Sequence, residues 1–173
     1  LRSDIERLMA TPVTLLDNMY EVSLTNSNPL LHPSRLYSMW KDWKPGDVYS
    51  RNSMFYEEWT EEAAAIYIAM DNELSLLLRV LPVSPGCIPG VLEYYESTDA
   101  ASLAAKLRSI EAFKGIPSPM KKVDGGYVPD FSSRYFTEDF PYGLAIIRNL
   151  AKEKHIPCPV IDKVYEWGMG KIS

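Results

Sequence analysis

Cysteine and histidine are scarce in this chain of 173 residues, which has two of each. The cysteines, Cys87 and Cys158, lie far apart and outside any C-x-x-C motif. This pattern argues against a disulfide framework and favours a reducing compartment such as the cytoplasm. The cysteines and histidines also lack the spacing of metal ligands, so no metal site is expected.

Longer patterns are missing as well. No apolar run reaches the roughly 18 residues that a membrane-spanning helix needs. There is no long basic stripe and the formal net charge is −5, so nucleic acid is not an expected partner. No G-x-G-x-x-G follows a candidate strand, so we expect no dinucleotide site in the chain itself. The first residue is Leu1 rather than Met, and we expect the chain to be a piece of a longer protein.

What the chain has is helical periodicity. Apolar residues recur with helical spacing and period-2 alternation is nearly absent, so we predict one all-α domain over residues 1–173. The longest helix is predicted over residues 61–81, with Thr60 as its cap, and should be the central rod of the fold. Other helices are predicted to start at Ser3, Thr11, Asn28, Asp99, near Ile146 and at Pro157–Pro159, with Gly168 as the last stop.

Two segments fall outside this periodicity. Residues 47–59 are irregular and crowded with aromatic side chains, including Tyr56 and Trp59. Such a cluster is more often core than the wall of a binding site. Residues 114–133 carry most of the remaining glycines and prolines and are predicted to form a loop of about 20 residues, a length that is often functional.

Two polar residues, Asn28 and His32, interrupt an otherwise apolar run. Asn28 can cap a helix and Pro29 suits the first helical position. The two polar side chains stand four residues apart and can face the same space, although Pro33 should bend or loosen that turn. Residue types alone favour a helix start with a buried, hydrogen-bonded histidine over a functional site.

A second pair of candidates lies about a hundred residues later. Arg134 follows the turn-rich loop, and an arginine can hold a carboxylate with two parallel hydrogen bonds. Asp139 lies near a helix start, and an aspartate beside a histidine can fix its tautomer. The plainer interpretations are a surface arginine and an aspartate that the helix dipole favours. The sequence alone does not show that Arg134, Asp139 and His32 meet.

Four blocks of sequence supply that link by resemblance. They are NPLLHPSRLY from Asn28, FYEEWTEEAAAIYIAMDNE from Phe55, RYFTEDFPYGL from Arg134 and HIPCPVIDKVYEWG from His155. In this order, spread over nearly the whole chain, they resemble the C-terminal helical domain of octopine and nopaline dehydrogenases, members of the opine dehydrogenases. The combination is specific, whereas any single block would be weak.

The resemblance implies a fold and an activity. The fold is a helical domain of the 6-phosphogluconate dehydrogenase C-terminal-like type, preceded in the full protein by a Rossmann domain that binds NAD or NADP. The implied reaction condenses an α-keto acid, often pyruvate, reductively with the amino group of an amino acid. The isolated chain is then expected to be inactive, and a helical domain deprived of its partner is expected to form a homodimer.

The resemblance also assigns roles to the candidate residues. It implies that His32 donates and accepts the proton, with Asp139 as its dyad partner. It implies that Arg134 grips a substrate carboxylate and that Asn28 orients the substrate or the histidine. Trp59 departs from the family pattern, in which a small residue is more common, and is expected to reshape the amino-acid pocket.

Two alternatives stay open at this point. One is another two-domain dehydrogenase, of the 6-phosphogluconate or ketopantoate reductase type, but those enzymes use a lysine near an asparagine and none follows Asn28 closely. The other is a non-catalytic helical dimerisation module, which predicts that His32, Asp139 and Arg134 lie apart and face solvent. The sequence does not name the amino acid, the keto acid, the choice of NAD or NADP, or the product stereochemistry.

Overall fold

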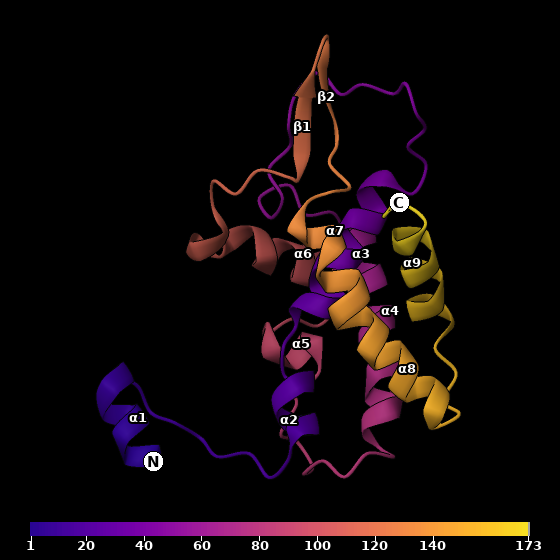
Figure 1. The fold of residues 1–173 in the computed structure, drawn as a ribbon. Coiled ribbons are helices and arrows are strands. Elements are labelled where there is room, and N and C mark those ends of the chain that lie inside the picture. Colours follow the sequence, from indigo (N-terminus) through magenta and orange to yellow (C-terminus); the bar gives the residue numbers. More distant parts are fainter. Residues whose placement is uncertain (173) are drawn as a thin grey trace.

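The computed structural model describes residues 1–172, and nearly all of its regular secondary structure is helical (Figure 1). The only sheet within this part of the chain is a two-stranded hairpin. The predicted fold class is therefore confirmed except for that hairpin. The elements in chain order are α1 Arg2–Met9, α2 Met19–Leu24, α3 Asn28–Trp40, α4 Glu61–Leu78, α5 Val91–Tyr94, α6 Ala100–Ser109, η1 Glu111–Phe113, β1 Met120–Val123, β2 Gly126–Pro129, α7 Arg134–Thr137, η2 Phe140–Leu144, α8 Ala145–Glu153 and α9 Pro159–Met169.

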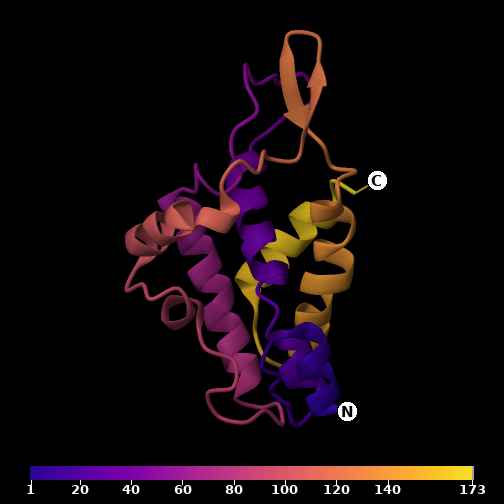
Figure 2. The same ribbon diagram turned by 90° about the vertical axis from the view of Figure 1, so that its left-hand side faces the viewer.

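The central rod is α4, as predicted. The Thr60 hydroxyl accepts a hydrogen bond from the backbone N–H of Ala63 at 3.1 Å, and Glu61 and Glu62 complement the helix dipole in the first turn. The helix packs against α3, α5, α6, α8 and α9, and Figure 2 shows it running beside α3 through the body of the domain. Among the described residues, no helix has both the length and the apolar character needed to cross a membrane.

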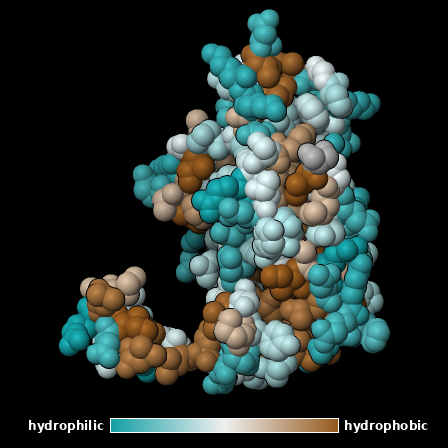
Figure 3. Space-filling model, viewed as in Figure 1, coloured by the Kyte–Doolittle hydropathy of each residue, from teal (hydrophilic) through white to brown (hydrophobic). Residues whose placement is uncertain are grey.

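The N-terminal segment differs from prediction. Helix α1 starts at Arg2, its cap position is Leu1, and none of its residues is buried, so the predicted cap at Ser3 is wrong. The helix predicted from Thr11 is also wrong, because the next one starts only after Asn18, whose side chain accepts hydrogen bonds from two backbone N–H groups of α2. Figure 3 shows apolar side chains gathered on α1 and the arm that follows it, away from the body of the domain.

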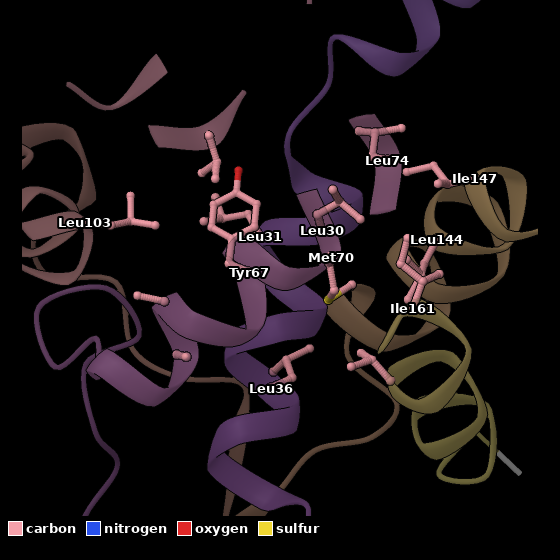
Figure 4. Close-up of a cluster of buried hydrophobic side chains, with 14 of the residues drawn as sticks. Leu30, Leu31, Leu36, Tyr67, Met70, Leu74, Leu103, Leu144, Ile147 and Ile161 are labelled. Carbon is pink, nitrogen blue, oxygen red and sulfur yellow. The ribbon is translucent and has the colours of Figure 1, made fainter. Parts of the chain in front are cut away.

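The core lies where α3, α4, α8 and α9 converge. Side chains from all four helices, together with Leu103 of α6 and Leu144 of η2, point into one cluster (Figure 4). Leu36, Met70 and Ile161 are fully buried there. This packing fixes the start of α3 against the chain segment that precedes α8, which is the arrangement that the site depends on.

The predicted loop over residues 114–133 contains the hairpin. Strands β1 and β2 pair antiparallel, with Met120 opposite Pro129 and Val123 opposite Gly126. Each strand has only four residues, too few to show as alternation in the sequence. Gly126 has φ of 152°, and a Cβ there would lie 2.1 Å from the Tyr49 carbonyl oxygen, so only glycine lets the hairpin approach the irregular segment before α4.

The last helix also ends differently from prediction. Gly168 does not stop α9, which runs to Met169. A Cβ at position 168 would lie 2.0 Å from a ring carbon of Phe140. The glycine therefore serves close packing of α9 against η2 rather than helix termination.

Candidate active site

At the start of α3 the side chain that bonds the backbone is that of Asn26, not that of Asn28. The backbone N–H of Asn28 donates to Asn26 Oδ1 at 3.1 Å, and Asn28 is already the first residue of the helix. The prediction that Asn28 caps the helix is therefore wrong. Its side chain is exposed, one turn before His32 on α3.

His32 lies in the second turn of α3 and is 9% exposed. The helix continues through Pro33 to Trp40, so the proline does not end it. An imidazole buried to this degree needs partners for both ring nitrogens, because a buried polar group without one costs about 1–3 kcal/mol.

One partner is Asp139. Its Oδ2 lies 2.7 Å from His32 Nδ1, although the two residues are 107 positions apart in the chain. The Asp139 side chain is 21% exposed and that of His32 11%. A carboxylate can only accept hydrogen bonds, so the proton of the neutral imidazole is on Nδ1 and Nε2 carries the lone pair.

Local structure after Asp139 brings it to α3. The next residues, Phe140–Leu144, form a π-helical turn with Pro141 inside it. Such turns occur frequently at functional sites. Gly143 in this turn faces Pro29, and a Cβ on Gly143 would lie 3.0 Å from Pro29 Cγ. A small residue at 143 thus lets the turn approach the first turn of α3 and places Asp139 within reach of the histidine.

The second partner of the histidine is Tyr56, which sequence reasoning did not assign to the site. The Tyr56 hydroxyl lies 2.7 Å from His32 Nε2. Burial raises the pKa of this phenol well above its ordinary value of 10.0, so the hydroxyl keeps its proton and can donate to Nε2. Phe55 and Tyr135 also surround the imidazole, with ring centroids 5.7 and 4.7 Å away in edge-to-face geometry. The only sequence signal for Tyr56 is the aromatic cluster of residues 47–59, and such a cluster predicts core.

Arg134 is close in sequence to Asp139 but makes a different contact. Its guanidinium forms two hydrogen bonds with the Glu138 carboxylate, at 2.7 and 2.9 Å. The pair is solvent-exposed, and the arginine lowers the pKa of Glu138. The structure therefore brings His32 and Asp139 together, while Arg134 and Asn28 lie exposed at the surface.

A cleft open to solvent runs beside the pair. It is lined by Asp139 and Glu138, by Asn26 and Pro29 at the start of α3, and by Tyr142. Leu24, Ile146 and Ile147 complete the lining, so a few polar groups stand in a largely apolar wall, as is usual for sites of small ligands. Trp59 is not part of its wall, because it is 1% exposed and belongs to the core. The expected effect of Trp59 on the pocket is thus not a direct contact.

Comparison with known proteins gives the family of the chain. The family described as NAD/NADP octopine/nopaline dehydrogenase, alpha-helical domain, matches residues 15–171. Tauropine dehydrogenase of Arabella iricolor is 35% identical over 167 residues, covering 87% of this chain and 41% of that protein. Opine dehydrogenase of Haliotis discus hannai is 31% identical over 176 residues, covering 94% of this chain and 43% of that protein.

Solved structures give the same result. Octopine dehydrogenase with NADH and pyruvate superposes with a TM-score of 0.85 at 27% identity, over 100% of this chain and 44% of that one. Octopine dehydrogenase with NADH and L-arginine gives 0.82 at 28% identity, over 99% of this chain and 45% of that one. The chain thus spans less than half the length of these relatives. It belongs to the octopine/nopaline dehydrogenase alpha-helical domain family.

Proposed function

We propose that this chain is the substrate-binding and proton-transferring domain of an NAD(P)H-dependent opine dehydrogenase. The enzyme would condense an α-keto acid such as pyruvate with the amino group of an amino acid. The observation that carries the proposal is the hydrogen bond of 2.7 Å between His32 and Asp139, next to a cleft that Asp139 lines. A non-catalytic dimerisation module would not need a buried imidazole joined to a carboxylate from the far end of the chain.

The reaction needs a group that exchanges protons at neutral pH. The amine adds to the keto carbon, water leaves, and hydride adds to the carbon of the resulting C=N bond. Overall, keto acid, amine, NAD(P)H and one proton give the opine, NAD(P)⁺ and water. A histidine suits the proton transfers. Asp139 would hold the Nδ1–H tautomer and stabilise the imidazolium when Nε2 takes a proton.

Arg134 and Asn28 are proposed to bind the substrate. The Arg134 guanidinium already binds one carboxylate, that of Glu138, with two hydrogen bonds. Exposed ion pairs contribute little to stability, so a substrate carboxylate can replace Glu138 at small cost. The Asn28 side chain is exposed at the start of α3, and its amide is proposed to orient the substrate.

The nucleotide is assigned to a separate domain. The described residues contain a two-stranded antiparallel hairpin and no parallel sheet of the kind that binds dinucleotides. They do not fit NAD or NADP by themselves, so the hydride is proposed to come from a cofactor held mainly by an N-terminal Rossmann domain. The fraction of its relatives that the chain covers and the exposed apolar side chains of Leu8, Met9 and Leu15 support such a partner.

The relatives are named for different compounds, tauropine and octopine, so the proposal names no amino acid for this chain. A homodimer and a cytoplasmic location belong to the proposal too. The second is supported by the two cysteines, Cys87 and Cys158, which are both free.

The test uses the full-length protein with NADH or NADPH, pyruvate and a panel of amino acids. His32→Asn should lower kcat by about 10²- to 10⁴-fold, the usual contribution of a general acid–base group. His155→Asn is the matched control, because His155 is the other histidine and has φ of 57°, which asparagine tolerates. His155→Asn should retain wild-type turnover. If His32→Asn stays within a few-fold of wild type, the proposed role of the histidine is wrong.

A further inference from the structure

Helix α1 stands apart from the rest of the domain. It has eight residues, and none of them is buried. The Leu8 side chain is 82% exposed and that of Met9 65%. Figures 1 and 3 show the helix on an arm, away from the body that the other helices form.

The exposed apolar side chains lie on one side of α1. Ile5, Leu8 and Met9 are spaced three and four residues apart, which puts them on one face of the helix. The charged side chains form ion pairs with one another along the helix. Helices shorter than about 12–15 residues are marginal in water unless an apolar face is packed. A helix of eight residues with its apolar face open therefore needs a surface that covers this face.

Hydrogen bonds divide the N-terminal segment into two pieces. After α1, the backbone N–H of Val13 donates to the Glu6 carboxylate at 3.1 Å, which ties the start of the arm to the helix. The backbone N–H of Asp17 donates to the Glu21 carboxylate at 2.8 Å, which ties the end of the arm to α2. Residues 14–16 connect the two pieces, and the match to the alpha-helical domain family begins among them, at residue 15.

We propose that the apolar face of α1 docks on the nucleotide-binding domain, so that this helix packs with that domain and not with the helical one. The inference rests on the proposed function, which places such a domain before this chain. The chain covers only 41% of tauropine dehydrogenase of Arabella iricolor, so more than half of such a protein lies outside it. A domain joined directly to α1 meets the helix at a high effective concentration, whereas a second copy of the chain must associate from solution.

Photo-cross-linking of the full-length protein identifies the surface that covers α1. A benzoylphenylalanine in place of Leu8 should form cross-links to the segment before Leu1 within one chain, as mapped by mass spectrometry. The same group in place of Ser3 is the matched control, because Ser3 is exposed on the opposite face of the helix. The yield of these cross-links from position 3 should be lower by about fivefold or more, because the opposite face points away from the docked surface.

Hydrogen exchange of the full-length protein measures the same contact without a cross-linker. Leu8→Glu puts a charge on the apolar face, and the amides of α1 should exchange about tenfold faster or more because the helix loses its packing. Ser3→Glu puts the same side chain on the opposite face, and the amides of α1 should exchange within about twofold of wild type. Exchange in α4 should be unchanged in both variants, which checks that the helical body remains folded.

Every other outcome overturns the proposal. Cross-links from position 8 to residues after Asp17 would mean that α1 packs on the helical body, and a cross-linked dimer would mean that a second copy covers it. Equal exchange in Leu8→Glu and Ser3→Glu would mean that nothing covers the apolar face.

Failure of the proposed function is a separate result. A protein without opine dehydrogenase activity whose α1 cross-links to the preceding domain would refute the activity and leave the docking intact. Turnover without those cross-links would refute the docking alone.

Discussion

The close packing of α9 against the π-helical turn gives a sharp test of how the fold positions Asp139. In Gly168→Ala, the added methyl carbon would lie 2.0, 2.2 and 2.6 Å from three carbons of the Phe140 ring. Carbon atoms pack without strain at about 3.5–4.0 Å, so the ring or the helix must move by roughly 1.5 Å. Phe140 is fully buried and directly follows Asp139 in the chain, so the movement should reach the site.

The expected magnitude follows from two opposing terms. Overpacking a dense core costs typically about 1–3 kcal/mol and occasionally more. Replacing glycine by alanine inside a helix returns up to about 1 kcal/mol. We expect a net loss of about 1–3 kcal/mol in the free energy of unfolding, and a fall in Tm of roughly 2–4 °C per kcal/mol for a domain of this size.

Urea and thermal unfolding of the chain measure the effect, with Gly170→Ala as control. Gly170 has φ of −69°, and a Cβ there would meet its nearest atom at 3.3 Å, so that variant should stay within about 0.5 kcal/mol of wild type. Adding Phe140→Leu to Gly168→Ala should recover part of the loss, since the two sites are in contact and do not add independently. If Gly168→Ala is as stable as Gly170→Ala, the packing argument is wrong.

Two other perturbations test the charges and the buried phenols. Arg134→Gln in the full-length enzyme should raise KM for the keto acid about 10- to 100-fold, the range for a lost charged hydrogen bond. Glu138→Gln should leave this KM unchanged or lower it. An equal rise of KM in both variants would mean that the ion pair has a structural role and does not bind the substrate. Burial raises the pKa of Tyr56 and Tyr67 above the ordinary 10.0, so the unfolded chain loses these protons first as pH rises. The contribution of these protonated phenols to the free energy of unfolding is then complete below pH 10 and declines above it. Denaturant unfolding at pH 8 and pH 10.5 should show a lower free energy of unfolding at the higher pH. The decrease should be smaller in Tyr67→Phe.

What could be predicted from the sequence was set by local interactions. Thr60 caps α4 and Asp99 caps α6 as predicted, because a cap bonds to backbone groups two or three residues away. The errors are also local: Asn26 instead of Asn28 bonds the first turn of α3, and the hairpin strands are too short to give a period. At α3 two nearby asparagines could bond the first turn, and in the hairpin each strand has only four residues.

The candidate site could be predicted only in part, for the opposite reason. His32 and Asp139 are 107 residues apart, and nothing local to either residue indicates the other. Resemblance to a family carried that link, and it did not carry Tyr56, whose aromatic neighbours made it look like ordinary core. A buried tyrosine is assigned to a core or to a site by where its hydroxyl points, and that direction depends on the packed structure.

Small residues are what let these distant parts meet. Gly143 allows the π-helical turn to approach Pro29 at the start of α3, and Gly168 allows α9 to approach Phe140 in the same turn. Gly143 belongs to the segment that follows Asp139, and Gly168 packs against Phe140 of the same segment. Contacts of its neighbours therefore bring the Asp139 carboxylate to His32, where its own hydrogen bond of 2.7 Å holds it, and this approach depends on how closely α3, η2 and α9 pack. The geometry of the proposed proton-transfer site depends on how densely the core is packed. Substitutions that loosen the core should therefore reduce activity before they unfold the chain.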